Sequence, residues 1–121
     1  MQKIYKIILN LKSKHKSNIV FDTRILKEND IFIGLKTEKN DGNTFYKAAI
    51  KKKACLAIVN VKTNDPNIIY VKDTKLFINK FCKFILDSYK GKIIAITGSV
   101  GKTTFKENIY HILKNKYHIN Y

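Results

Sequence analysis

A chain of 121 residues has room for one modest domain, or for a small domain and the start of another. Apolar residues make up 45% of it, which excludes a wholly disordered chain. The net charge of +15 invites a nucleic-acid interpretation, but all but one of the 24 basic residues are lysines, scattered through every segment. Specific nucleic-acid binders use arginine for bidentate contacts, so we expect no specific nucleic-acid partner and interpret the charge as compositional.

No apolar run is long enough to span a membrane, and the N-terminus lacks the apolar core and cleavage site of a signal peptide. We therefore expect a cytoplasmic protein without a membrane span, and a monomer. Cys55 and Cys82 lie far apart in apolar surroundings, and we expect both to be buried structural thiols. The three histidines, His15, His111 and His118, have no paired carboxylate nearby in the sequence, and we interpret them as surface or packing residues.

Short apolar runs bounded by turn residues predict strands in the first part of the chain. They cover residues 18–21, 31–35, 55–59 and 68–71. The run Cys-Leu-Ala-Ile-Val at 55–59 is apolar throughout, as in a strand that is covered on both faces. Strands of this kind, alternating with helices, predict an α/β fold.

Helical spacing appears between these runs. Residues 4–11 could form a short helix or a strand, and a helix is favoured. After a turn signal at 40–43, Thr44 could cap a helix that runs to about residue 52. The inner face of that helix is expected to carry Phe45, Ala48 and Ala49. The lysine run at 51–53 is interpreted as its solvated end.

A longer helix follows the last of these strands, capped by Asp73 or Thr74 and ended by Gly91. Its apolar residues keep helical spacing: Leu76, Phe77, Phe81, Phe84, Ile85 and Tyr89. We expect residues 1–89 to close as one small domain and residues 90–121 to begin a second.

The sequence Gly-Ser-Val-Gly-Lys-Thr-Thr at 98–104 follows an apolar segment, 92–97, that predicts a buried strand. A helix with Phe105, Ile109, Ile112 and Leu113 on its inner face is expected next. Strand, glycine loop and helix in this order bind a polyphosphate, because glycines let backbone N–H groups turn toward the phosphate oxygens and the helix N-terminus adds partial positive charge.

This loop predicts an ATP site. Its candidate ATP-binding residues are Gly98, Ser99, Val100, Gly101, Lys102, Thr103 and Thr104. Lys102 can reach the β- and γ-phosphates, which makes it the candidate catalytic residue. The hydroxyl of Thr103 can ligate Mg²⁺, and Thr103 is therefore the one candidate metal ligand.

The spacing of the loop is distinctive. The common phosphate-loop pattern has a glycine five positions before Gly101, whereas here Gly98 stands three positions before it. This shorter form resembles the loop of the Mur ligases and their folylpolyglutamate synthetase relatives. The resemblance covers roughly residues 18–112, because further motifs of the family occur upstream in its order and spacing. They are Asp-Thr-Arg at 22–24, the stretch 29–36, Asp41-Gly42 followed by Phe45, and Val-Lys-Asp-Thr at 71–74.

The chain departs from the family pattern at four of these positions. Thr23 replaces the usual serine, and Asn29 replaces a glycine, although asparagine also tolerates a positive φ. Thr37 stands where the family has glycine, and Asn43 where it often has histidine. These departures concern recognition of the nucleotide sugar.

The resemblance implies a small N-terminal Mur ligase domain, followed by the first strand, P-loop and helix of a central ATPase domain in a truncated or partial chain. It implies that the first domain holds the UDP portion of the substrate near Asp22, Thr23, Arg24, Asp41 and Gly42. From the residues alone, Arg24 could equally form a salt bridge with Asp22 or with an aspartate at 30, and Asp41-Gly42 favours a tight turn. The residues favour a helix cap as the role of the aspartate at 73.

Within the family, Ser99 and the Lys-Glu pair at 106–107 favour the branch that joins D-alanyl-D-alanine to UDP-N-acetylmuramoyl-tripeptide in peptidoglycan precursor synthesis. In the reaction that this implies, ATP phosphorylates the terminal carboxylate of the UDP-muramoyl peptide, and the amine of D-alanyl-D-alanine attacks the acyl phosphate. Two alternatives stay open: another Mur-type ligase such as MurE, and a stand-alone or degenerate nucleotide-binding fragment without ligase activity.

Overall fold

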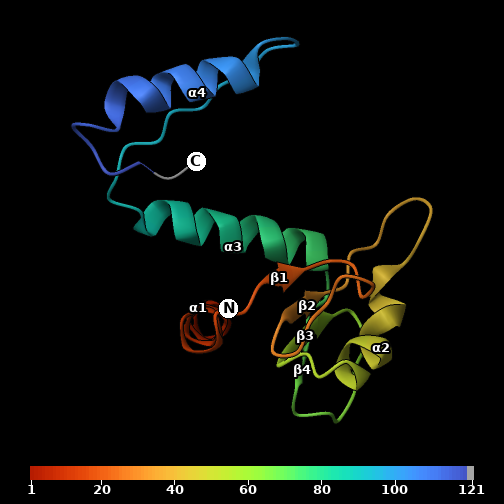
Figure 1. Ribbon diagram of the computed structural model, residues 1–121. Coiled ribbons are helices and arrows are strands. Elements are labelled where there is room, and N and C mark those ends of the chain that lie inside the picture. The colour runs from red at the N-terminus through yellow and green to blue at the C-terminus, as the bar shows by residue number, and fades with distance from the viewer. Residues whose placement is uncertain (120–121) are drawn as a thin grey trace. The chain divides into compact units, whose positions relative to one another are not determined.

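The computed structural model describes residues 1–119. The chain divides into two compact units, Met1–Tyr89 and Lys90–Tyr121. The first carries a parallel sheet with helices, and the second carries the helix α4 (Lys102–Leu113) after the glycine loop (Figure 1). The expected α/β fold is confirmed. None of the helices within residues 1–119 combines the length and the apolarity of a membrane span.

The sheet of the first unit has four parallel strands in the order β1-β2-β3-β4. Their bounds are β1 (Ile19–Val20), β2 (Ile31–Ile33), β3 (Leu56–Val59) and β4 (Ile68–Tyr70). Every residue of β2 and β3 is buried, as the continuous apolar run of β3 predicted. Because all four strands run in one direction, their carboxyl ends point to the same edge of the sheet.

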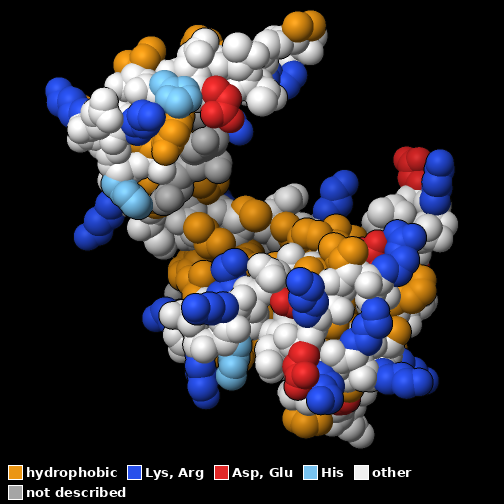
Figure 2. Space-filling model, viewed as in Figure 1, with side chains coloured by type: hydrophobic (Ala, Val, Ile, Leu, Met, Phe, Trp, Pro, Cys, Tyr) orange, Lys and Arg blue, Asp and Glu red, His pale blue; other side chains and the backbone are white. Residues whose placement is uncertain are grey.

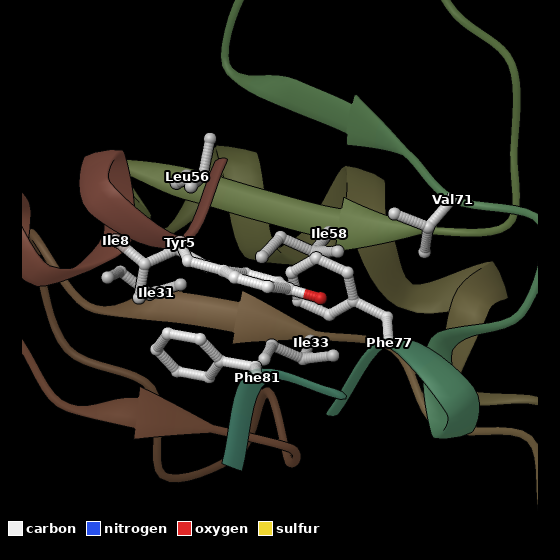
Figure 3. Close-up of a cluster of buried hydrophobic side chains, with 9 residues drawn as sticks. All are labelled: Tyr5, Ile8, Ile31, Ile33, Leu56, Ile58, Val71, Phe77 and Phe81. Carbon is white, nitrogen blue, oxygen red and sulfur yellow. The ribbon is translucent and has the colours of Figure 1, made fainter. Parts of the chain in front are cut away.

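One face of the sheet is covered by α1 (Gln2–His15) and α3 (Thr74–Ser88). Figure 3 shows the aromatic centre of this layer, where the Tyr5 ring lies 5.5 Å from that of Phe77 and 5.4 Å from that of Phe81. Side chains of alternate strand residues, among them Ile31 and Ile33, point into the same cluster. The helix favoured for residues 4–11 is therefore correct, and it extends further in both directions.

The stripe that α3 buries is narrower than its sequence pattern predicted. Phe77 and Phe81 are buried and Phe84 packs against them, whereas Leu76 is 49% and Ile85 40% exposed. A helix that rests on a sheet covers it with one stripe, and positions 76 and 85 lie about 80–100° around the helix from residue 77 at 100° per residue. The expected cap is confirmed, because the Asp73 carboxylate accepts a hydrogen bond from the Leu76 N–H at 2.8 Å.

The opposite face is covered by α2 (Tyr46–Lys51), which follows the 3₁₀ turn η1 (Gly42–Phe45). The predicted inner face of this helix was correct for Ala49, which is buried with Tyr46 and Ile50 beside it, and wrong for Ala48, which is exposed, and for Phe45, which is 50% exposed. The predicted Thr44 cap was also wrong. The 3₁₀ turn comes first and is capped by the carboxylate upstream of it, so the helix begins later and its buried face shifts by one position.

The two thiols differ from their expected burial. Cys55 is half-buried, and burial raises the pKa of its thiol. Cys82 is exposed, because it lies beside the buried Phe81 on the flank of α3 that faces away from the sheet. The expectation of two buried thiols was therefore wrong for Cys82. The histidines at 15, 111 and 118 are exposed, as expected.

The predicted strand before the glycine loop does not form. Residues 92–98 adopt no strand, and Ile93 and Ile94 are 61% and 59% exposed. A strand needs a hydrogen-bonded neighbour, and residues 90–119 contain no other strand with which this segment could pair. The helix after the loop does form, but α4 buries no residue: Phe105, expected on its inner face, is 54% exposed.

The difference between the two apolar segments is measurable by hydrogen exchange. We expect the amides of 93–96 to exchange faster than those of 56–59, because only the latter donate into a ladder that is buried on both faces. Residue-resolved exchange on the 121-residue chain measures both. Equal protection of the two segments would contradict the absence of a strand before the loop.

Candidate functional site

The candidate substrate residues follow the ends of neighbouring strands. The segment Asp22–Arg24 leaves the carboxyl end of β1, and the loop that contains Asp41-Gly42 follows β2. Ligands of parallel α/β sheets bind outside the carboxyl ends of the strands. No hydrogen bond or ion pair joins these two groups of candidate residues in the part of the chain that the structure describes. Each group is therefore held in place by its own set of hydrogen bonds.

Asp22 and Arg24 form a close ion pair. The Arg24 Nε donates to both Asp22 carboxylate oxygens at 3.0 Å, and Nη2 donates to Oδ2 at 2.6 Å. The backbone N–H of Arg24 also donates to Oδ1, at 2.8 Å. These hydrogen bonds, helped by the positive charge of Arg24, lower the pKa of Asp22 to about 2. Of the two salt bridges considered from the sequence, the one with Asp22 forms.

Asp30, the other candidate partner, has a different role. It is buried, and its carboxylate accepts the backbone N–H of Asn18 and of Lys27, each at 2.9 Å. These bonds tie the residue before β1 and the later part of the β1–β2 connection to the residue that precedes β2. Asn29, just before it, has φ of 67°, in agreement with the expected positive φ at this position.

Asp41 is the cap of the turn that precedes α2. Its Oδ1 accepts the Asn43 backbone N–H at 3.0 Å and the Asn43 side-chain amide at 2.7 Å, and these bonds lower the pKa of Asp41. Asn43 is buried, and its Oδ1 accepts the backbone N–H of Asn60, just after β3, at 2.7 Å. The tight turn favoured by the sequence is therefore confirmed, and Asn43 links it to the end of the neighbouring strand.

Sequence reasoning missed how closely the loop around this turn is packed. A Cβ on Gly42 would lie 2.6 Å from the carbonyl oxygen of Leu35, and a Cβ on Gly34 would lie 2.7 Å from the Cα of Asn43. The Gly42 N–H donates to that same Leu35 oxygen at 2.8 Å. Two glycines thus let the segments that follow β2 and precede α2 touch through their backbones. The presence of glycines on both sides of the loop was the available signal.

An open hollow lies beside this loop. Its lining residues are Leu35, Lys36, Thr37, Glu38 and Lys75. Thr37, which stands where the family has glycine, bonds within the loop: its N–H and its hydroxyl both donate to the carbonyl of Asn40, at 2.8 and 3.0 Å. This local turn shapes the wall of the hollow.

The glycine loop of the second unit opens directly onto α4. Gly98 and Gly101 have φ of 147° and 79°, values that side-chain-bearing residues rarely adopt, and Gly101 is the N-cap of α4. Lys102 donates its ammonium to the carbonyl of Gly98. Val100 at the tip is 90% exposed. The backbone conformation, the exposed loop and the helix N-terminus together fit a nucleotide phosphate group.

The residues that could hold a metal ion are few. Within residues 1–119 no three His, Cys, Asp or Glu side chains gather as a metal site. Thr103, in the first turn of α4, is exposed beside the loop. A Mg²⁺ ion would therefore fit here with the Thr103 hydroxyl as the protein ligand and with phosphate oxygens supplying further ones.

The ion pair makes a testable contribution to the pKa of Asp22. We expect Arg24→Gln to raise this pKa from about 2 toward the ordinary 3.8, because the charged hydrogen bonds are lost. A depressed pKa stabilises the fold above the ordinary value, and this contribution is lost as the pH falls from about 3.8 to about 2. Carboxyl NMR titration of the wild type and of Arg24→Gln measures the pKa of Asp22. Asp41, whose pKa is lowered by Asn43, serves as the internal control and should not change.

The close packing at Gly42 can be tested by measuring the stability of a variant. We expect Gly42→Ala to reduce the free energy of unfolding by about 1–3 kcal/mol, because the added Cβ would meet the Leu35 carbonyl. Lys39→Ala, at an exposed position of the same loop, is the control and should stay within about 0.5 kcal/mol. Urea unfolding of the two variants measures both. An unchanged Gly42→Ala variant would show that the loop relaxes freely.

We compared the sequence of this chain with those of known proteins. The chain matches no protein-family model. It is 37% identical over 100 residues to the UDP-N-acetylmuramoyl-tripeptide–D-alanyl-D-alanine ligase of Buchnera aphidicola subsp. Acyrthosiphon pisum, covering 81% of this chain and 22% of that protein. The ligase of the same name from Bacillus subtilis is 30% identical over 106 residues, covering 84% and 23%. The UDP-N-acetylmuramoyl-L-alanyl-D-glutamate–2,6-diaminopimelate ligase of Prochlorococcus marinus is 36% identical over 97 residues, covering 72% and 19%.

Solved structures agree with these matches. The MurF ligase from Thermotoga maritima in complex with ADP has a TM-score of 0.68 and 33% identity, covering 83% of this chain and 24% of that one. MurF from Acinetobacter baumannii has a TM-score of 0.71 and 25% identity, covering 92% and 28%. The chain spans 19–23% of the three curated relatives above. It belongs to the Mur ligase family, corresponds to the N-terminal part of its members, and resembles the MurF ligases in most of its matches.

Proposed function

We propose that this chain provides the UDP-binding domain and the ATP phosphate loop of a ligase that joins D-alanyl-D-alanine to UDP-N-acetylmuramoyl-tripeptide. The observation that carries the proposal is a glycine loop opening onto α4, in a chain that aligns with MurF ligases over 81–84% of its length. In this proposal, residues 1–89 bind the nucleotide sugar and residues 90–121 begin the ATP-binding domain. A cytoplasmic location and a monomeric state remain part of it.

The loop residues 98–104 would hold the phosphates of ATP. The positive φ values of Gly98 and Gly101 turn the peptide groups of the loop, and the N-terminal N–H groups of α4 add partial positive charge. Lys102 would exchange the Gly98 carbonyl for the β- and γ-phosphate oxygens. The Thr103 hydroxyl would ligate Mg²⁺, which neutralises phosphate charge when bound.

The UDP portion would bind beside β1. Arg24 keeps most of its donors for a ligand, because Nε and one Nη2 proton satisfy Asp22 while Nη1 and the second Nη2 proton remain. Its side chain is 88% exposed. A guanidinium oriented by a carboxylate is suited to a diphosphate, which it can contact through two parallel hydrogen bonds. Asp41 is engaged within its turn, so Asp41-Gly42 would act by shaping the loop and through backbone groups.

The chemistry assigned to this chain is charge stabilisation. As the γ-phosphoryl group moves to the peptide carboxylate, negative charge builds on its oxygens, and Lys102 at the helix N-terminus offsets that charge. The attack of the D-alanyl-D-alanine amine on the acyl phosphate then expels phosphate. In this proposal, the first domain binds the UDP end of the same substrate molecule, so that binding energy from a remote part of the substrate contributes to the reaction.

A second candidate is a diaminopimelate-adding ligase, favoured by the 36% identity to the Prochlorococcus marinus protein. The two candidates differ in the amine and in the length of the acceptor peptide. The test is phosphate release by the enzyme that contains this chain, with each pair of substrates in turn. We expect turnover with D-alanyl-D-alanine and the tripeptide; turnover only with diaminopimelate and the dipeptide would reverse the choice. Absence of both activities would support a nucleotide-binding fragment.

The role of Lys102 is testable in that enzyme. We expect Lys102→Ala to lower kcat by about a hundredfold or more, because the developing phosphoryl charge would keep only backbone N–H partners. Affinity for the UDP-sugar should stay unchanged, since that ligand is assigned to the first domain. Lys92→Ala, an exposed lysine outside the loop, is the control. Normal ligase activity of Lys102→Ala would refute the assignment of the loop.

A further inference from the structure

Three consecutive lysines, at positions 51–53, lie at the C-terminal end of α2, and their side chains have different partners. The Lys52 ammonium donates to the carbonyl oxygen of Thr23 at 2.7 Å and to that of Arg24 at 3.4 Å. Lys53 forms an exposed ion pair with Glu28 at 3.3 Å. Lys51 has no side-chain hydrogen bond or ion pair with any residue in the range 1–119. Only Lys52 thus reaches the segment that carries the candidate UDP-binding residues.

The two carbonyls that Lys52 binds belong to adjacent residues. Peptide groups of an extended chain alternate in direction, so two successive carbonyls meet one ammonium only where the backbone turns. Holding them fixes the peptide planes on both sides of the Arg24 Cα. The direction in which the Arg24 side chain leaves the backbone is therefore fixed as well.

The same segment is also held by the carboxylate of its own first residue. Asp22 accepts the backbone N–H of Arg24 at 2.8 Å and binds its guanidinium. The positive charge of Lys52 also acts on Asp22, where it contributes to the lowered pKa. A cation thus binds the carbonyls of this short segment while an anion binds its N–H groups, and both ions lie within one local network.

We propose that Lys52 is a positioning residue for UDP binding: it holds the 22–24 segment so that the remaining Nη1/Nη2 edge of the Arg24 guanidinium is presented to the diphosphate. The inference rests on the proposed function, because it takes the UDP site as given. Lys52 itself does not contact the ligand. Without the two hydrogen bonds from Lys52, the 22–24 segment samples several conformations. The free energy needed to order the segment then reduces the observed affinity for UDP.

The test uses free UDP and the 121-residue chain, with calorimetric titration of the wild type and three variants. Lys52→Met keeps the length of the side chain and removes its donors and charge, and we expect it to weaken UDP binding about tenfold, which corresponds to one or two net hydrogen bonds. Lys52→Arg keeps donors and charge and should retain most of the affinity. Lys51→Met is the matched control for the loss of one positive charge, and its affinity should stay within about twofold.

A second measurement reports on position directly. Arg24 is the sole arginine, so its Nε–H gives an unambiguous NMR signal. We expect this signal to be sharp in the wild type and in Lys51→Met, and to broaden or shift in Lys52→Met as the segment loses its fixed conformation. Thermal unfolding of each variant separates this local change from a loss of the fold.

The outcomes separate the inference from the proposed function. If the wild type does not bind UDP, the proposed UDP site fails and the inference fails with it. If the wild type binds UDP and Lys52→Met binds it equally well, the inference alone is wrong. An equal loss of affinity in Lys51→Met would show that the effect comes from net charge. A loss of affinity that only accompanies unfolding would show that it comes from lost stability. Either result overturns a positioning role.

Discussion

Burial of β2 and β3 on both faces is the constraint on which the rest of the first unit depends. A parallel sheet of this kind exposes neither face to water, so helices must cover both. On one side the covering is aromatic, with Tyr5 wedged against Phe77 and Phe81. On the other side Ala49, which has no bulk beyond its Cβ, lets the short helix α2 approach the strands. With both faces occupied, the strand ends are the part of the sheet left for a ligand.

The two parts of the candidate UDP site are held by different physics. The loop after β2 is held by contact between backbones, since Gly34 and Gly42 leave no space for a side chain. The segment after β1 is held by charged hydrogen bonds from Asp22 and Lys52, at exposed or half-exposed positions. Steric contact does not depend on the salt concentration, whereas salt screens the attraction between exposed charges. Salt therefore weakens the hydrogen bonds of the Arg24 segment before it affects the packing of the loop.

Local chemistry was predictable from this sequence, and pairing between distant segments was not. The uniformly apolar run of β3, the Asp73 cap and the turn at Asp41 depend on residues within a few positions of one another, and each prediction was confirmed. The strand expected at 92–97 required a neighbour that a local pattern cannot supply. The face of α2 was missed because a 3₁₀ turn delayed the start of the helix and rotated its pattern. The contact from Lys52 to Thr23 spans 29 positions and has no sequence signal at all.

The dispersed lysines affect the electrostatic attraction of anionic ligands to the proposed UDP site. In Figure 2, Lys and Arg side chains are spread over the visible face of the first unit, with no single basic patch. Such a distribution attracts any polyanion weakly and selects none. Selection must then come from cations whose geometry is fixed. Arg24 is fixed by a carboxylate that accepts from Nε and Nη2 along one edge of its planar fork, and a lysine at this position could not bind that carboxylate and keep parallel donors for a diphosphate. In the proposed UDP site, the one arginine of the chain would thus supply a planar, oriented cation, and Lys52 would support it through the backbone.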